Sequence, residues 1–217
     1  MVLQLDGGRS GLFDLYVADG SDDRLAVVVL QEWWGLNDQI RDVCDRLAAE
    51  GFTAAAPDLY RGKVALDVAE AEHLSEGLDW DTACDEQIAA TVRHLGSRYA
   101  KVAVMGFCMG GALAVFAGIR LAGVDGVVAY YGLPPEDAAD PTDMRARFLG
   151  HFGIHDDWIT PAVADAFMKR LSDASPQASA YSYDADHAFA NEEGGAYSMA
   201  DAELAWERTI RFLHEIA

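Results

Sequence analysis

The sequence predicts an α/β protein with a mostly parallel central sheet and helices on both faces. From residue 25 onward, short apolar runs alternate with longer amphipathic segments, which is the pattern of a parallel sheet covered by helices. The longest apolar run, Leu25–Leu30, is about a third of the roughly 20 residues that cross a bilayer. We therefore interpret this run as a strand that is buried on both faces of the sheet.

Further strands and helices are expected to alternate along the chain. The strands are expected at Leu25–Leu30, Phe52–Ala56, Lys101–Met105, Val124–Tyr130, Ala146–Phe152 and Ala178–Ser182. The helices are expected between Asn37 and Gly51 and at residues 64–77, 80–96, 110–121, 161–172 and 199–215. The leading segments Val2–Leu5 and Leu12–Val17 are expected to form an antiparallel hairpin at one edge.

Local signals place the ends of these elements. Asn37 is a favourable helix N-cap, Gly51 a favourable helix terminator, and Pro57 ends the second strand. Two of the helices show apolar residues at helical spacing, namely Ile40, Val43, Cys44 and Leu47 in the first and Trp80, Cys84, Ile88, Val92 and Leu95 in the third. Cys44 and Cys84 are therefore interpreted as core residues.

Length and charge narrow the class of protein. A chain of 217 residues is expected to form a single domain over residues 1–217. Its formal net charge of −20 opposes contact with phosphate backbones and anionic lipids, so neither nucleic acid nor membrane is expected as a partner. The 51% hydrophobic content indicates a folded, soluble protein. The acidic stretch Pro134–Asp143 is interpreted as a solvated loop with a short helical turn.

The cysteines and the first residues favour a reducing, cytoplasmic location. The chain has three cysteines, and none of them forms a CxxC pair of the kind found in zinc or redox sites. Residues 1–11 show neither a basic leader nor an apolar stretch typical of a signal peptide.

The strongest chemical signal is the segment Gly106–Gly111, GFCMGG, between an expected strand and an expected helix. It has the form G-x-nucleophile-x-G, with Cys108 where serine is more usual. Glycines two residues to either side of the nucleophile avoid collisions in a tight turn. Such a turn lifts the thiol above the sheet and places it at a helix N-terminus, which favours a thiolate.

A cysteine nucleophile needs a base and a group that orients the base, and on this scaffold the acid precedes the histidine in the chain. His187 follows the last expected strand and is the best candidate base, whereas His151 and His214 are interpreted as structural or surface residues. Asp156 and Asp157 both follow the preceding strand, and either could orient the imidazole. A metal site at residues 155–157 is not favoured, because no second cluster supplies further ligands.

The sequence closely resembles the dienelactone hydrolase family of the α/β-hydrolase fold over nearly its whole length. The likeness is carried by the motifs QEWWGLN (31–37), IRDV (40–43), APDLY (56–60), GFCMGG (106–111), YYG (130–132), GIHD (153–156) and HAF (187–189). The resemblance implies a Cys108, Asp156 and His187 triad, and so selects Asp156 over Asp157.

The resemblance also implies roles around the triad. Glu32, in the QEWWG motif, would take the proton of a cysteine that rests as a thiol. The backbone N–H groups of Trp33 and Met109 would form the oxyanion hole. The side chains expected to contact substrate are Trp34, Arg61, Trp158, Phe189 and Asn191.

The chain departs from the family at the position of Asn191, where members acting on carboxylated lactones carry an arginine. Arg61 and Lys63 are the basic residues between positions 57 and 92. Loss of the guanidinium removes a charge-assisted pair and favours neutral substrates.

Together these features predict a cysteine-dependent hydrolase of small esters or lactones that works through an acyl-enzyme. No cofactor and no metal are expected, and the chain is expected to be a monomer or a small homo-oligomer. Two alternatives remain open: an inactive hydrolase fold that binds a small ligand, and a thiol redox protein.

Overall fold

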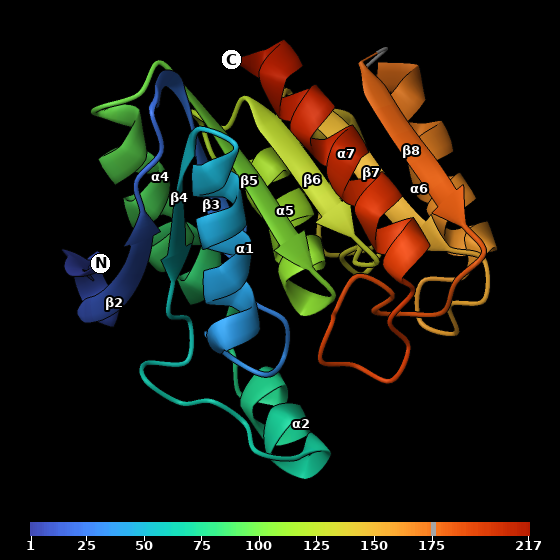
Figure 1. The fold of residues 1–217 in the computed structure, drawn as a ribbon, viewed down its shortest axis with the longest axis horizontal. Helices are drawn as coiled ribbons and strands as arrows, with labels where there is room; N and C mark the ends of the chain where they lie inside the picture. The colour runs from blue at the N-terminus through green and yellow to red at the C-terminus, as the bar shows by residue number, and fades with distance from the viewer. Residues whose placement is uncertain (175–176) are drawn as a thin grey trace.

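The computed structural model describes residues 1–174 and 177–217 and contains an eight-stranded sheet (Figure 1). The strand order is β1-β2-β4-β3-β5-β6-β7-β8; β1 and β2 are antiparallel to their neighbours and β3 to β8 are parallel. This confirms the predicted mostly parallel sheet and the hairpin at its edge. The strands are β1 (Val2–Asp6), β2 (Leu12–Ala18), β3 (Asp22–Leu30), β4 (Phe52–Pro57), β5 (Lys101–Phe107), β6 (Gly126–Tyr130), β7 (Arg147–Gly153) and β8 (Ala178–Tyr183).

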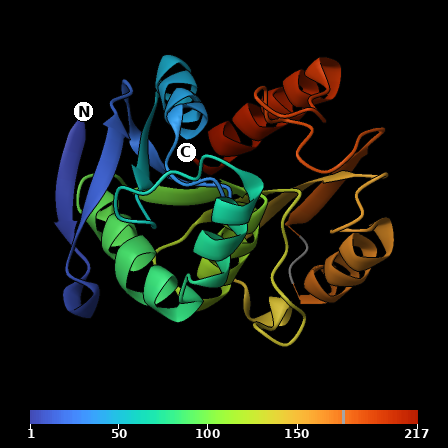
Figure 2. The ribbon, with the colours of Figure 1, turned by 90° about the horizontal axis from the view of Figure 1, so that it is seen from below.

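Helices cover both faces of the sheet. Figure 2 shows α1 and α7 on one face and α4, α5 and α6 on the other, while α2 projects beyond the carboxyl ends of the strands. The helical segments are η1 (Gly8–Ser10), α1 (Asp38–Ala49), α2 (Val68–Glu76), α3 (Trp80–Thr82), η2 (Ala83–Ile88), α4 (Ala89–Gly96), α5 (Met109–Arg120), η3 (Pro141–Asp143), α6 (Pro161–Ala174) and α7 (Met199–Ile216).

Strand β3 explains why the apolar run Leu25–Leu30 is continuous. Successive side chains of a strand point to opposite faces. Leu25, Val27 and Val29 pack in the cluster that includes α1 and α7, whereas Ala26, Val28 and Leu30 pack in the cluster that includes α4 and α5. Both faces of β3 are therefore buried, as predicted. Cys44 belongs to the first cluster and Cys84 to the second, which confirms that both are core residues.

Several elements differ from the prediction in their bounds or geometry; for example, β3 begins at Asp22 instead of Leu25, and β6 begins at Gly126 instead of Val124. The helix expected over 64–77 begins at Val68, because Asp67 caps it and Val64 instead forms an antiparallel bridge with Gly35. The helix expected over 80–96 contains a π-helical turn, η2, from which Gln87 donates a hydrogen bond to the carbonyl of Asp58 at 3.1 Å. Pro57 is the last residue of β4 and pairs with the antiparallel strand β2.

The order of the strands reverses between β3 and β5. The chain leaves β3 to form β4 on one side, then returns to form β5 on the other side. In parallel sheets, a crevice opens at the carboxyl ends of the strands where the order reverses, and ligands commonly bind there. The loops after β3 and β5, which carry Glu32 and Cys108, meet at this point.

None of the helices described within 1–174 and 177–217 is long and apolar enough to span a bilayer.

In the acidic loop after β6, the expected helical turn is η3, and Asp140 caps it.

A buried cluster of hydrogen-bonded side chains links β7 to β8 and α7. His151 lies in β7 with 0% exposure. Its Nδ1 is hydrogen-bonded to the Tyr183 hydroxyl at 2.7 Å and its Nε2 to Thr209 Oγ1 at 3.0 Å. Thr209 also bonds the hydroxyl of Tyr130 at 2.7 Å. Burial, with a smaller contribution from the nearby Arg208 charge, lowers the pKa of His151 to about 3.

This burial predicts a pH-dependent contribution to stability. Between about pH 6.5 and 3 the unfolded chain binds a proton at His151 that the folded chain does not bind, so the free energy of unfolding falls as pH falls through this window. The contribution is at most about 1.4 kcal/mol per pH unit. We expect His151→Gln to show a shallower pH dependence than the parent in urea titrations at pH 7, 6, 5 and 4. Parallel curves would contradict a neutral, buried His151.

Candidate active site

Cys108 occupies a strained turn between β5 and α5. Its backbone φ is +52° and its ψ is −117°, a conformation that costs a residue with a side chain about 1–3 kcal/mol. The Cys108 N–H donates to the carbonyl of Tyr130 at 3.0 Å, which anchors the turn to the end of β6. The turn that the sequence predicts is therefore present, with its thiol partly exposed.

The glycines around Cys108 are required by close backbone contacts. A Cβ atom on Gly106 would lie 2.1 Å from the Gly110 carbonyl oxygen. A Cβ atom on Gly110 would lie 2.4 Å from the carbonyl oxygen of Gln31, at the end of β3. Gly132 touches the turn from β6, because its Cβ would lie 2.0 Å from the carbonyl oxygen of Cys108. These contacts bring three strand ends together around the thiol.

His187 lies in the loop after β8 and reaches the thiol. Its Nε2 is 3.1 Å from Cys108 Sγ, and its Nδ1 is 2.7 Å from Asp156 Oδ2. Asp156 follows β7, so the three side chains come from the carboxyl ends of β5, β7 and β8, which lie on the same edge of the sheet, with β6 between β5 and β7. Distances of this size are within hydrogen-bond reach for a nucleophile, a base and the group that orients it.

The structure distinguishes Asp156 from Asp157. Asp156 is 2% exposed, and its Oδ1 accepts hydrogen bonds from the N–H groups of Trp158 at 2.7 Å and Ile159 at 2.8 Å. Burial raises the pKa of Asp156, but the hydrogen bonds from His187, Ile159 and Trp158 outweigh this and hold the pKa below its usual value. Asp157 is exposed. Asp156 is therefore the aspartate that contacts the imidazole.

The environment favours a protonated His187. Burial lowers the pKa of His187, but the hydrogen bonds to Asp156 and Cys108 outweigh burial and raise the pKa to about 10. An imidazolium at this distance is the counter-ion that a thiolate requires.

Glu32 is fully enclosed at the end of β3. It is 2% exposed, and its carboxylate accepts hydrogen bonds from Asn191 Nδ2 at 2.7 Å and from the Tyr131 hydroxyl at 3.2 Å. Burial raises the pKa of Glu32, and these two hydrogen bonds oppose the rise. Within the described residues, no hydrogen bond joins Glu32 to Cys108, and the transfer of the thiol proton to Glu32 on arrival of substrate, which the family resemblance implies, stays a prediction.

The predicted donors to an oxyanion are the backbone N–H groups of Met109 and Trp33. Met109 is the first residue of α5, and the first N–H groups of a helix have no partner within it. Trp33 follows Glu32 in the neighbouring loop. Neither N–H donates a hydrogen bond within the part of the chain that the structure describes.

Aromatic side chains border the pair of Cys108 and His187. Trp158 is stacked on the His187 ring with centroids 5.7 Å apart, and it meets Trp33 edge-on at 5.8 Å. Trp34 in turn meets Trp33 at 5.4 Å. Trp158 is 66% exposed, so one of its faces is available to a ligand. Trp158 thus lies against His187 and Trp34 lies behind Trp33, and their contact with substrate stays a prediction.

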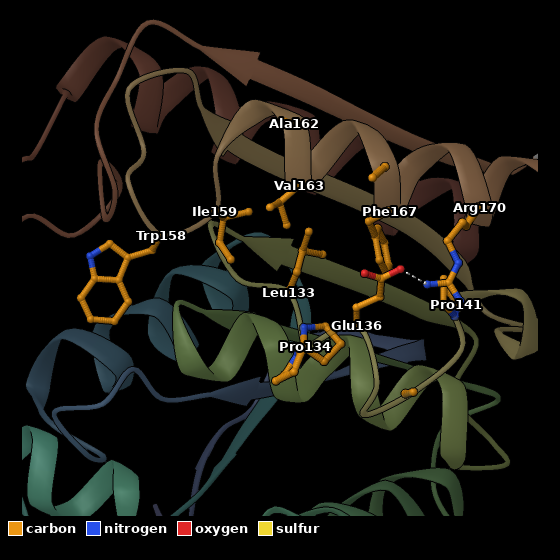
Figure 3. A pocket seen from close by; sticks show the side chains of 13 residues that line it. Leu133, Pro134, Glu136, Pro141, Trp158, Ile159, Ala162, Val163, Phe167 and Arg170 are labelled. Carbon is orange, nitrogen blue, oxygen red and sulfur yellow. Dashed lines mark hydrogen bonds and ion pairs between the residues drawn. The ribbon is translucent and has the colours of Figure 1, made fainter.

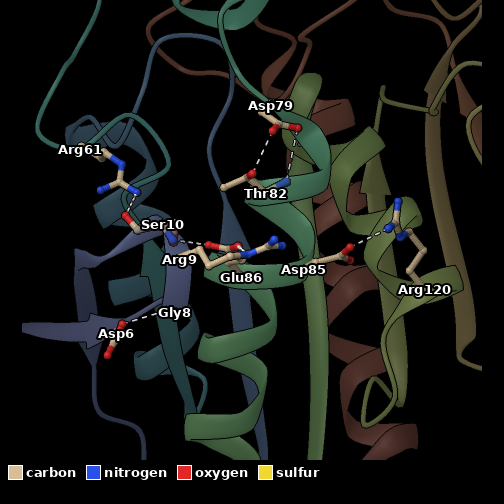
Figure 4. Close-up of polar contacts among 10 residues, drawn as sticks. All are labelled: Asp6, Gly8, Arg9, Ser10, Arg61, Asp79, Thr82, Asp85, Glu86 and Arg120. Carbon is tan, nitrogen blue, oxygen red and sulfur yellow. Dashed lines mark hydrogen bonds and ion pairs between the residues drawn. The ribbon is translucent and has the colours of Figure 1, made fainter.

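Three other residues that were expected to contact substrate have their side chains packed against or hydrogen-bonded to other residues of the protein. Phe189 is 0% exposed and packs on Tyr131 and Tyr183. Asn191 is buried, with its amide group bonded to Glu32 and its Oδ1 accepting the N–H of Glu193 at 3.0 Å. The guanidinium of Arg61 binds the carbonyls of Ser10 and Leu12 at the edge hairpin (Figure 4).

Two tyrosines belong to the site although the sequence assigned them no role. Tyr131 bonds Glu32 and places its ring edge-on to His187 at 5.2 Å. Tyr60 directs its hydroxyl to Met109 Sδ at 3.4 Å. Both tyrosines lie in motifs that carry the family likeness, which is the signal that could have identified them. Among the described residues, no group of three or more His, Cys, Asp or Glu side chains could hold a metal ion.

The fold and its site define a hydrolase of the α/β-hydrolase class. The crystal structure of a protein from Klebsiella pneumoniae, provisionally named a dienelactone hydrolase, superimposes with a TM-score of 0.82 at 25% identity, covering 99% of this chain and 98% of that chain. The family model for the dienelactone hydrolase family matches residues 13–217. The chain belongs to this family.

Sequence relatives agree with this assignment. A protein of Escherichia coli strain K12, provisionally named a carboxymethylenebutenolidase, is 30% identical over 87% of this chain and 76% of its own length. A Bradyrhizobium protein named as a probable 2-oxo-3-(5-oxofuran-2-ylidene)propanoate lactonase is 31% identical over 87% of this chain and 82% of its own length. The chain is an ester or lactone hydrolase.

Proposed function

We propose that the chain hydrolyses small, neutral esters or lactones with Cys108 as the nucleophile, His187 as the general acid and base, and Asp156 as the group that orients His187. The observation that carries this proposal is the continuous hydrogen-bonded path from Cys108 Sγ to His187 Nε2 at 3.1 Å and from His187 Nδ1 to Asp156 at 2.7 Å.

The proposed reaction begins with attack of the Cys108 thiolate on the acyl carbon. The carbonyl oxygen becomes an oxyanion and accepts hydrogen bonds from the N–H groups of Met109 and Trp33. The tetrahedral intermediate then expels the alcohol oxygen, which takes the proton from His187 Nε2. The products of this half-reaction are a thioester on Cys108 and a free alcohol.

Deacylation reverses these roles. His187 takes a proton from a water molecule as that water attacks the thioester carbon. Collapse of the second intermediate releases the acid and returns Cys108 to the thiolate beside the imidazolium. The Asp156 carboxylate stabilises the imidazolium in each half-reaction and fixes which ring nitrogen faces the sulfur.

Glu32 is assigned a positioning role in this proposal. Its carboxylate accepts hydrogen bonds from Tyr131 and Asn191, and it directly precedes Trp33, whose N–H is proposed to bind the oxyanion. His187 Nε2 already lies at hydrogen-bond distance from Cys108 Sγ, and it accepts the thiol proton in this proposal.

The preference for neutral substrates follows from the cations near the site. Asn191 replaces a guanidinium, and Arg61 is directed to the carbonyls of Ser10 and Leu12. The Bradyrhizobium relative is named for a substrate that carries a carboxylate. A carboxylate bound here would lack an equivalent partner, and leaving it unpaired is costly.

A hydrolase is favoured over a thiol redox protein by the other two cysteines. Burial raises the pKa of Cys44 and raises that of Cys84 to about 12, and both side chains lie within the core. Buried thiols with raised pKa values are poor nucleophiles, which disfavours their reaction with a sulfenic acid on Cys108.

Replacement of Cys108 by alanine tests the proposed function. We expect Cys108→Ala to lose at least about 1,000-fold in kcat/KM for p-nitrophenyl acetate while keeping its fold, since removal of a catalytic nucleophile leaves little catalysis. Cys44→Ala serves as the control, and circular dichroism checks both folds. Turnover at the parental rate in Cys108→Ala would refute the proposal.

A pair of isosteric substitutions tests the assignment of the acid. Asp156→Asn removes the charge that holds His187 and is expected to lower kcat by about 100-fold or more. Asp157→Asn, its exposed neighbour, is expected to change kcat by less than about twofold. The two variants are compared by steady-state kinetics, and the opposite order of effects would contradict the role given to Asp156.

A further inference from the structure

A groove next to the candidate active site has no role in the reaction described above. It has a volume of about 520 Å³ and lies between the loop after β6 and the first turns of α6 (Figure 3). Most of its lining is apolar, including Leu133, Pro134, Ile159, Val163 and Phe167. Val163 is 48% exposed. Apolar side chains gathered in an open hollow mark a binding surface.

One end of the groove adjoins the reacting groups. Trp158, which stands at this end, is the residue stacked on His187 (Figure 3). Leu133 directly follows Gly132, whose backbone touches the carbonyl of Cys108. One wall of the groove therefore begins at Leu133, next to a glycine that contacts the Cys108 backbone, and the other begins at Trp158, which contacts the imidazole.

At the other end of the groove, the positive charge of Arg170 is paired with two carboxylates. Arg170 pairs with Glu136 at 3.3 Å and with Asp140 at 3.2 Å. Two carboxylates around one guanidinium leave a net negative charge. This end therefore offers no free cation to a carboxylate.

The direction of proton transfer decides which half of an ester enters the groove. The oxygen that leaves must lie next to His187 Nε2, because it takes its proton there. The group attached to that oxygen therefore extends on the His187 side, where Trp158 leads into the groove. The oxyanion lies on the other side, against the N–H groups of Met109 and Trp33.

We propose that this groove binds the alcohol half of a neutral, open-chain ester with an extended apolar alkyl group. The proposal rests on the proposed function and deepens it by naming the substrate class. A small lactone has its leaving oxygen within the ring, so it leaves most of the groove empty. An alkyl ester fills the groove and gains affinity with each methylene that is buried, by about fourfold.

Two ester series on the full-length chain test this proposal. The first series varies the alcohol of an acetate from ethyl to octyl, and the second varies the acid of an ethyl ester over the same lengths. We expect kcat/KM to rise about fourfold per methylene over several steps of the first series and to stay within about threefold across the second. A flat first series, or a rise confined to the second, would overturn the proposal.

A substitution that fills the groove provides the matched variant. Ala166 lines the groove on the exposed side of α6, whereas Ser172 is exposed on the same helix outside it. We expect Ala166→Trp to abolish the rise of kcat/KM with alcohol length. Ser172→Trp should keep the parental dependence. An unchanged dependence in Ala166→Trp would show that the chain binds elsewhere.

A charged analogue and a binding measurement complete the test. The acetate ester of 8-hydroxyoctanoate ends in a carboxylate, which would lie beside Glu136 and Asp140. Its kcat/KM should be at least about tenfold lower than that of octyl acetate. Equal values of kcat/KM would overturn the claim that the groove takes neutral substrates. Calorimetry on Cys108→Ala should show tighter binding of octyl acetate than of ethyl acetate. Equal affinities would refute the groove even if Cys108 is the nucleophile, whereas turnover by Cys108→Ala would refute the proposed function itself.

Discussion

The close backbone contacts around Cys108 are the constraint on which the rest of the structure depends. A residue with a side chain is held at φ +52° because the flanking strand ends press against its turn from both sides. Gly110 lies against the carbonyls of Leu30 and Gln31, and Gly132 lies against the carbonyl of Cys108 itself. The same contacts that force the thiol above the sheet thus fix β3, β5 and β6 relative to one another. Any atom added at these glycines would displace the backbone of the turn that carries the sulfur.

The second constraint on the site is the burial of two carboxylates, those of Asp156 and Glu32. Asp156 remains ionised at 2% exposure because two backbone N–H groups and His187 satisfy it. Together with Cys108, it raises the pKa of His187, the group beside the sulfur. The environment of Glu32 differs from that of Asp156, because its hydrogen-bond partners are neutral side chains and burial raises its pKa. Two carboxylates a short way apart are thereby suited to different tasks, as their environments require.

The sequence predicts the features that depend on local rules and strand order. The glycine spacing around Cys108 and the N-cap at Asn37 follow from steric and hydrogen-bond requirements that a few residues express, whereas the choice of Asp156 over Asp157 came from the family resemblance. Contacts between distant segments were beyond such rules. Arg61 turns to the edge hairpin, and Asn191 bonds Glu32 across 159 positions of sequence. The π-helical turn at η2 and the groove beside α6 arise from tertiary packing, which no short motif records.

Trapping of the acyl-enzyme tests the central claim most directly. A slowly hydrolysed aryl ester would be mixed with the protein, quenched in acid within the first turnover, and analysed by intact mass and peptide mapping. The account predicts one acyl group per chain, on the peptide that carries Cys108, and its release by hydroxylamine, as a thioester requires. Turnover with the acyl group on another residue, or with no covalent adduct under conditions where the first product appears as a burst, would contradict it.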